Sequence, residues 1–473
     1  MNPPFHHPAW IADTNIYEVN LRQYTREGTF AAFAREMPRL RDMGIETLWF
    51  MPITPISLDK RKGSLGSYYA CSDYTATNPE FGTIDDFTQL VQSAHALGFK
   101  VIIDWVANHT GWDHHWTREH PEYYRKNLAG NFFEAHGWED VIDLDYDNAG
   151  LRAAMVEAMS FWVKRCDIDG FRCDMAMLVP LDFWRGAREA LDKQKELFWL
   201  AECEEVNYHE VFDATYAWRW LHKMEAVWRH ESGLDGLDEV LRSYDREFPP
   251  DAIRAYFTSN HDENSHSGSE YERIGDAAKA FAVFCCTWHG VPLIYSGQEL
   301  PNLKRLQFFD KDPIEWTGQY ALHGFYKELL TLRKRNPALR AVGDASTGAA
   351  PASGGGGAAS GGAVVGGTGT GSSGAAPASS GGGAVATAGD VAVTTQRITD
   401  GIDIYRSFAF LRKNGENEVL VVLNLSTSPL VVPLERLRPG GVFQQIFGGE
   451  ALDLAMGGTI ELPAWGFLVL EKI

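Results

Sequence analysis

The feature that most constrains the fold is a regular alternation of short apolar runs with amphipathic stretches. Several of the runs are continuously apolar, which is typical of strands buried on both faces of a parallel sheet. Amphipathic stretches with helical spacing separate them, for example at residues 30–43, 84–97, 151–165 and 276–288. The eight runs lie at residues 15–24, 45–53, 99–106, 168–176, 197–202, 213–218, 254–260 and 291–296.

This pattern predicts an α/β protein, and eight strands with helices between them favour a (β/α)8 TIM barrel. An open doubly wound sheet is the alternative. No glycine-rich phosphate loop follows the first strand, which argues against a nucleotide-binding version of that sheet. Thr83 before residues 84–97 and Gly44 and Gly98 after helical stretches are in positions typical of helix caps.

The rest of the chain predicts three further parts. Residues 110–142 follow the third strand, lack a clean period and are rich in aromatic residues and histidine, so we expect a short inserted domain (domain B) there. The barrel would then comprise residues 1–109 and 143–344. Residues 345–389 are uncharged and rich in Gly, Ala and Ser, which predicts a flexible segment. Short β-rich runs within residues 390–473 predict a C-terminal antiparallel β-sandwich.

Composition limits the partners. The 43 Lys and Arg against 63 Asp and Glu give a net charge of −20, which disfavours binding to nucleic acid or to an anionic membrane. No run is apolar enough to predict a membrane span, and the N-terminus shows no signal peptide, so we expect a cytoplasmic protein, with a processed secreted form as the alternative. The six cysteines form no CxxC pair and predict neither a zinc site nor a disulfide framework. The oligomeric state stays open.

Charged residues gather where the predicted strands end. A carboxylate in a buried strand is costly unless it is paired or functional, and the C-terminal strand ends of a barrel meet at one rim. Four strands ending in this way therefore predict one site. The charged residues at these strand ends are Asp104 and His109 on the third strand, Arg172 and Asp174 on the fourth, Glu202 on the fifth, and His261 and Asp262 on the seventh.

Two of the carboxyl groups are expected to differ in charge. Arg172 and Asp174 lie two residues apart on one face of a strand, so the guanidinium would keep Asp174 ionised as a nucleophile. Glu202 follows apolar neighbours, and desolvation would raise its pKa and keep it protonated. One ionised and one protonated carboxyl group is the arrangement used in retaining glycoside hydrolysis.

These residues resemble those of a known family. DxxxNH at residues 104–109, GFRxD at 170–174, the acid at Glu202 and NHD at 260–262 are similar to the motifs of the α-amylase family, retaining α-glucan enzymes on a (β/α)8 barrel. Secondary matches are LWFMPI at 48–53, GSYYACSDY at 66–74, VIDLDYDN at 141–148 and GVPLIYSGQE at 290–299. The order and spacing of these motifs carry the resemblance, which covers nearly all of the chain.

The resemblance implies a role for each residue. Asp174 would be the nucleophile, Glu202 the acid and base, and Asp262 would hold two hydroxyl groups of the sugar. His109 and His261 would bind the same sugar, and Arg172 would orient Asp174. Tyr69 would stack under the ring and Asp104 would support the pocket, although a packed ring and a core hydrogen bond are equally good interpretations of these two. Four aromatic residues of the inserted domain are candidates for sugar stacking or for simple packing: Trp112, Trp116, Phe133 and Trp138.

The family's calcium-dependent members imply a metal site at Asn108 and Asp143. Leu178 stands where a further ligand, often His, is found in them, so Ca²⁺ stays an open alternative and no cofactor is expected to be required. Cys173 and Cys203 adjoin the two catalytic carboxylates, but no partner arrangement marks either thiol as a nucleophile.

The resulting hypothesis is hydrolysis of α-1,4-glucosidic bonds in starch-like glucans or maltooligosaccharides with net retention. The alternatives are a transglycosylase or an exo-acting α-glucosidase on short α-glucosides. A catalytically inactive scaffold of the same fold is a third hypothesis, against which the intact Asp174, Glu202 and Asp262 argue.

Overall fold

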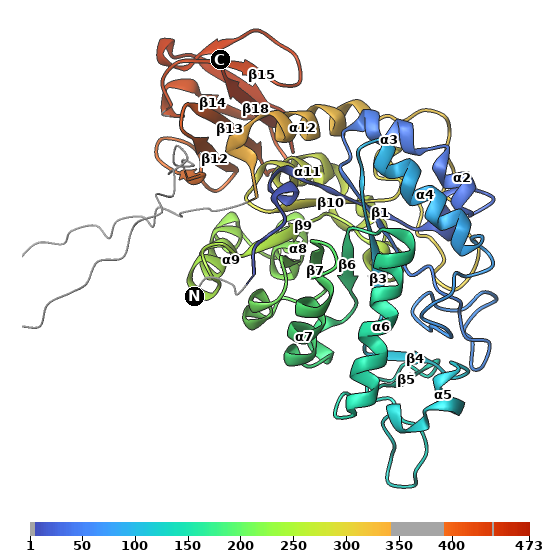
Figure 1. Ribbon diagram of the computed structural model, residues 1–473. Coiled ribbons are helices and arrows are strands. Elements are labelled where there is room, and N and C mark those ends of the chain that lie inside the picture. The colour runs from blue at the N-terminus through green and yellow to red at the C-terminus, as the bar shows by residue number, and fades with distance from the viewer. Residues whose placement is uncertain (1–4, 342–391, 438) are drawn as a thin grey trace, which may run out of the picture.

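A closed barrel forms the centre of the molecule (Figure 1). The computed structural model describes residues 5–341, 392–437 and 439–473, so the predicted flexible segment 345–389 lies outside the described residues. Within these ranges, eight parallel strands pair in the order β1-β10-β9-β8-β7-β6-β3-β2. They are β1 (Ile16–Val19), β2 (Thr47–Phe50), β3 (Lys100–Trp105), β6 (Gly170–Cys173), β7 (Phe198–Ala201), β8 (Ala214–Tyr216), β9 (Ile253–Tyr256) and β10 (Val291–Tyr295).

Each of these strands falls on a predicted apolar run, so the barrel is confirmed and the open sheet is wrong. Helices cover the outside of the barrel (Figure 1). They are α1 (Leu21–Tyr24), α2 (Phe30–Ala34), α3 (Met37–Met43), α4 (Ile84–Ala96), α6 (Ala149–Cys166), α7 (Leu181–Leu191), α8 (Trp218–Trp228), α9 (Leu234–Glu247), α10 (Glu270–Ile274), α11 (Ala278–Thr287) and α12 (His323–Arg335). No helix in the described ranges is long and apolar enough to cross a membrane.

Local residues explain where several helices begin and end. Thr83 forms a capping box with Asp86 at the start of α4, and Gly44 ends α3 in the left-handed region with φ of 95°. The stretch 30–43, expected to be one helical run, is two helices. Pro38 lies in the first turn of α3, where its missing N–H breaks no helical hydrogen bond.

The insertion after β3 is short and largely irregular. It holds the strand pair β4 (His109–Gly111) and β5 (Val141–Asp143), which run antiparallel, and the single turn α5 (Trp116–Glu119). Figure 1 places it at the opposite end of the molecule from the C-terminal strands. Its position at the C-terminal end of β3 puts it beside the rim where the predicted site residues lie.

The C-terminal part is the predicted antiparallel sandwich. A six-stranded sheet in the order β11-β12-β13-β18-β15-β16 faces the pair β14-β17, with a separate apolar core between them. The strands are β11 (Thr394–Ile398), β12 (Ser407–Asn414), β13 (Asn417–Asn424), β14 (Leu430–Pro433), β15 (Val442–Gln445), β16 (Leu452–Asp453), β17 (Thr459–Leu462) and β18 (Phe467–Lys472). β11 was not expected, because its residues TTQRI are mostly polar and Ile398 is its buried side chain.

The two faces of this six-stranded sheet contact different cores. Phe408 and Phe410 of β12 pack into the apolar core of the barrel, whereas the intervening Ala409 packs into the core of the sandwich. β13 alternates in the same way, with Val421 toward the barrel and Val422 toward the sandwich. Alternation with a period of two is typical of a strand. One face of the C-terminal sheet therefore packs toward helices α11 and α12 (Figure 1).

Candidate functional site

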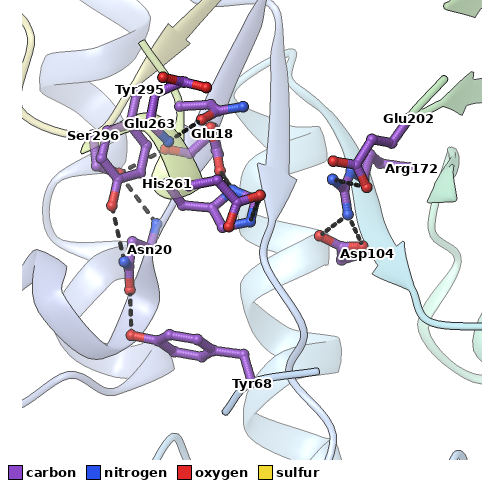
Figure 2. A network of polar contacts seen from close by, with 12 residues as sticks. Glu18, Asn20, Tyr68, Asp104, Arg172, Glu202, His261, Glu263, Tyr295 and Ser296 are labelled. Atoms are coloured by element: carbon purple, nitrogen blue, oxygen red, sulfur yellow. Dashed lines mark hydrogen bonds and ion pairs between the residues drawn. The ribbon is translucent and has the colours of Figure 1, made fainter. Parts of the chain in front are cut away.

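Arg172 holds three carboxyl groups at the C-terminal rim. The side chain is fully buried, and its Nη1 donates to Asp104 Oδ1 and to Asp174 Oδ1, each at 2.9 Å. Its Nη2 forms an ion pair with Glu202 Oε2 at 2.8 Å (Figure 2). The strand register explains this meeting, since β3, β6 and β7 are neighbours and each acid lies in or directly after its strand. The two predicted catalytic carboxyl groups therefore share one guanidinium.

Burial sets the protonation of these acids. It raises the pKa of Asp174 to about 6, against the lowering effect of Arg172 and with a raising effect of Asp104. Burial likewise raises the pKa of Glu202 to about 7, again against Arg172. The prediction for Glu202 is confirmed in direction. Arg172 lowers the pKa of Asp174 as expected, but the effect of burial is larger, and the single positive charge of Arg172 is divided among three buried carboxyl groups.

Asp262 lies in a second cluster, beside a charged histidine. β9 ends at Tyr256, earlier than expected, and His261 and Asp262 precede a π-helix at Glu263–Ser267. His261 Nε2 lies 3.2 Å from Asp262 Oδ2. Burial alone would lower the pKa of His261, but Asp262 and Glu18 raise it well above its usual range. Burial would raise the pKa of Asp262, yet His261 lowers it to about 2.

Glu18 is a residue of this cluster that sequence reasoning missed. It belongs to β1, its side chain is fully buried, and its Oε1 lies 2.5 Å from His261 Nδ1 (Figure 2). The same signal that marked the other acids, a carboxylate inside a buried strand, was present in the run IYEV. It was overlooked because Glu18 stands mid-strand rather than at a strand end.

Tyr69 joins the two clusters. Its hydroxyl donates to Asp104 Oδ2 at 3.1 Å and lies 2.7 Å from His261 Nε2. Its ring stacks on those of His261 and Phe308, with 5.4 Å and 6.2 Å between the ring centroids. The ring of Tyr69 is thus packed and its hydroxyl is hydrogen-bonded within the site.

A cavity of about 320 Å³ opens between these residues. Of the predicted site residues, five line it: Tyr69, His109, Asp174, Glu202 and Asp262. Asp104, Arg172 and His261 do not line it and lie behind its wall, where they contact the lining side chains. Glu18, Asp262 and Tyr69 surround the ring nitrogens of His261, and direct binding of His261 to the sugar stays a prediction. His109 is neutral, since burial lowers its pKa to about 4.

Loop residues complete the cavity wall. Lys62, Asp140, Phe308 and Phe309 line it and come from loops that carried no readable signal in the sequence. Among the four aromatic candidates of the insertion, Trp138 lines the cavity and packs against His109 at 5.4 Å between ring centroids. Trp116 is buried in the packing of the insertion, while Trp112 and Phe133 do not line the cavity.

The predicted metal site offers oxygen atoms from two side chains, Asn108 and Asp143. Asp143 Oδ2 accepts from the Ala135 N–H at 3.2 Å, Oδ1 is buried without a hydrogen-bond partner, and burial raises the pKa of Asp143. The amide nitrogen of Asn108 lies 3.2 Å from His109 Nδ1. Leu178 offers no side-chain oxygen, and the described part of the chain holds no group of three His, Cys, Asp or Glu arranged for a metal ion. We therefore derive no step through calcium.

The cysteines beside the acids are unsuited to nucleophilic attack. Burial raises the pKa of Cys203 to about 12 and that of Cys173 well above its usual range, so both remain thiols. All six cysteines lie in the described ranges, and each is free and buried.

Comparison with known proteins gives matches along most of the chain. A family model described as the catalytic domain of alpha amylase matches residues 7–140 and 126–316, and one described as the C-terminal domain of maltogenic amylase matches residues 403–469. A solved noncanonic maltogenic alpha-amylase from Thermotoga neapolitana is 26% identical with a TM-score of 0.80, covering 98% of this chain and 99% of that one. An alpha-amylase from Lactobacillus plantarum is 25% identical with a TM-score of 0.79, at 98% and 99% coverage.

Among curated proteins, an alpha-amylase from Haloarcula japonica is 28% identical over 361 residues. That match covers 72% of this chain and 51% of the relative, so the chain spans about half the length of that protein.

Proposed function

Since the chain belongs to the alpha-amylase family, we propose that it is a retaining glycoside hydrolase that cleaves α-1,4-glucosidic bonds in starch-like glucans or maltooligosaccharides. The observation that carries the proposal is the pair of carboxyl groups, Asp174 and Glu202, held by one guanidinium on the wall of one cavity. In a retaining enzyme the two groups must reach the same glycosidic bond. Their different surroundings supply one carboxylate and one carboxylic acid.

In the first step the Asp174 carboxylate attacks C1 of the sugar. The bond from C1 to the glycosidic oxygen breaks, and the Glu202 proton passes to that oxygen as the alcohol leaves. In the second step Glu202, now ionised, takes a proton from water, whose oxygen attacks C1 and releases Asp174. Two inversions at C1 give net retention.

The other residues position and stabilise. Asp262, ionised by His261, accepts hydrogen bonds from the sugar hydroxyls, and Tyr69 offers an aromatic face to the ring. Arg172 remains charged throughout and limits the build-up of negative charge when both acids are ionised. No metal ion is needed for either step.

The test is a time course on maltoheptaose, with the anomeric form of the first product followed by NMR. The α-anomer is expected first. The Glu202→Gln variant should lower turnover by about 10²- to 10⁴-fold while its circular dichroism is preserved. An initial β-anomer, no cleavage, or full activity of the variant would contradict the proposal.

Transfer to a sugar acceptor is a second candidate. Relatives named alpha-1,4-glucan:maltose-1-phosphate maltosyltransferase match part of the chain, one from Chlorobaculum tepidum at 30% identity over 213 residues. The match to the Chlorobaculum tepidum protein covers 40% of this chain and 32% of that relative. The same time course separates the two candidates, because transfer produces oligosaccharides longer than the substrate.

A further inference from the structure

The segment 57–66, which follows β2, is attached to the inserted domain at one of its ends. The Leu58 N–H donates to Asp113 Oδ2 at 2.8 Å, and Lys60 Nζ lies 3.1 Å from the centroid of the Trp112 ring. Lys62 Nζ forms an ion pair with Asp140 Oδ1 at 2.9 Å. Asp140 directly precedes β5 and is buried, so the strand pair β4-β5 fixes the position of this carboxylate.

The other end of the same segment is attached to the loop after β10. The Ser64 N–H donates to Asp310 Oδ1 at 2.8 Å, and the Leu65 N–H donates to the carbonyl oxygen of Phe309 at 3.0 Å. From below, the buried Arg22 donates to the Gly66 carbonyl oxygen at 3.0 Å. The segment therefore spans the rim from the insertion to the β10 loop and is held on both sides.

We call segment 57–66 the bridge. The strand order shows which side of the cavity the bridge covers. β3, β2, β1 and β10 are consecutive around the barrel, so the segment covers that arc of the rim. Glu202 directly follows β7. This strand is separated from β2 by β6 and β3 and lies on the other arc. Glu202 protonates the leaving group, so the leaving part of the substrate lies toward β7. The sugar that bonds to Asp174 lies toward Tyr69, below the bridge.

We infer that the bridge, closed by the Lys62–Asp140 pair, blocks the cavity beyond the retained sugar and makes the enzyme act on the non-reducing ends of α-glucan chains. In a glucan, the retained sugar continues toward the non-reducing end of the chain. A chain cut in its interior would have to pass between the bridge and the barrel, where Lys62, Asp140 and Phe309 line the wall. This inference rests on the proposed function.

The size of the cavity agrees with a short retained portion. Its volume of about 320 Å³ lies at the lower end of the range of about 300–1,000 Å³ found for small-molecule sites. The ion pair is partly accessible, with the Lys62 side chain 36% exposed and that of Asp140 7% exposed.

The experiment compares two maltoheptaoses, one free and one whose non-reducing terminal glucose carries a 4,6-O-ethylidene acetal. The initial rates of substrate loss are measured for both, and their ratio is the readout. The wild-type protein is expected to consume the free substrate at least about tenfold faster, because the acetal enlarges the terminal sugar that must enter the closed end. Equal rates would overturn the inference while leaving the proposed function intact. Cleavage of neither substrate would instead overturn the proposed function.

Variants then test the bridge itself. Lys62→Ala and Asp140→Ala are expected to bring the ratio close to one, and the exchanged double variant Lys62→Asp with Asp140→Lys to restore a preference for the free substrate. Lys195→Ala is the matched control, since the pair of Lys195 Nζ with Asp167 Oδ1 at 2.6 Å precedes β6 and β7 at the opposite, N-terminal end of the barrel. A ratio unchanged in both bridge variants would overturn the assignment of the closure to Lys62 and Asp140.

Discussion

At the scale of single residues, the sharing of Arg172 among three acids predicts a narrow pH optimum. Asp174 must be ionised to attack and Glu202 must be protonated to donate. Because the pKa of Asp174 is raised to about 6, kcat/KM falls as the pH drops below that value. Because the pKa of Glu202 is about 7, kcat/KM falls again above it. The pair titrates together, so a pH profile of kcat/KM reports both limbs as properties of the pair.

A substrate that needs no acid separates the two limbs. With an α-maltosyl fluoride, whose leaving group departs without protonation, the Glu202→Gln variant is expected to keep the acid limb and lose the alkaline one. The wild-type protein measured with maltoheptaose, whose leaving group needs the proton, is the control and should show both limbs. An alkaline limb that persists in the variant would show that a group other than Glu202 sets it.

Glu18 carries a second prediction at this scale. Glu18→Gln removes the charge beside His261 Nδ1, so the pKa of His261 should fall and Asp262 should lose part of its stabilisation. We expect kcat to drop by about 10- to 100-fold, which corresponds to the loss of one hydrogen bond to a charged group. Nitrogen NMR of His261 against pH checks the cause, since a merely structural role would leave its titration in place. Glu46→Gln, which alters a surface pair with Arg41, is the control and should change neither quantity.

Much of the site could be predicted from the sequence because the C-terminal ends of all barrel strands lie at one rim. This rule found Asp174, Glu202 and Asp262 without knowledge of the contacts between them. It did not find Lys62 or Asp140, since the path of a loop depends on tertiary contacts such as the ion pair between them. It also could not show that one guanidinium serves three carboxyl groups, whose pKa values burial raises against the lowering effect of Arg172.

At the scale of elements, continuous apolar runs predicted all eight barrel strands, because burial on both faces leaves a strong signature. The signal was weaker at the edge of the C-terminal sheet. β11 is polar on most of its length and forms because its backbone pairs with β12, which no local pattern reveals. The split between α2 and α3 was readable in principle, since Pro38 stood within the expected helix.

Two glycines give a matched prediction about these elements. A Cβ on Gly170 in β6 would overlap the Phe198 carbonyl oxygen of the neighbouring strand β7, and a backbone atom cannot move aside cheaply. Gly170→Ala should therefore lower the free energy of unfolding by about 1–3 kcal/mol or more. A Cβ on Gly186, exposed within α7, meets nothing within 4 Å, so Gly186→Ala should raise it by about 0.5–1 kcal/mol. Chemical denaturation of both variants checks the opposite signs, and destabilisation by both would contradict the steric explanation.

At the scale of the whole molecule, the barrel and the C-terminal sheet share one apolar core. Phe410 of β12 is fully buried and packs on Trp288 at 4.8 Å between ring centroids, next to α11. Arg412, two residues later on the same face, donates from Nε to the Ala338 carbonyl oxygen at 3.0 Å. Two units joined through a continuous core are expected to unfold together, because exposing one face of the sheet also exposes the helices that it covers.

Phe410→Ala tests this coupling by a change in the C-terminal sheet, outside the catalytic site. Removing the ring leaves a cavity between β12 and α11, and the expected loss is about 3–5 kcal/mol in the free energy of unfolding. The loss should appear as one calorimetric transition at a lower temperature, and activity should disappear in that same transition although Phe410 belongs to the C-terminal sheet. Val431→Ala, at a position 56% exposed on β14, is the control and should change stability by less than about 0.5 kcal/mol. If the C-terminal sheet of the Phe410 variant melted first while activity persisted, the barrel would be stable without it, and the shared core would not couple the two parts.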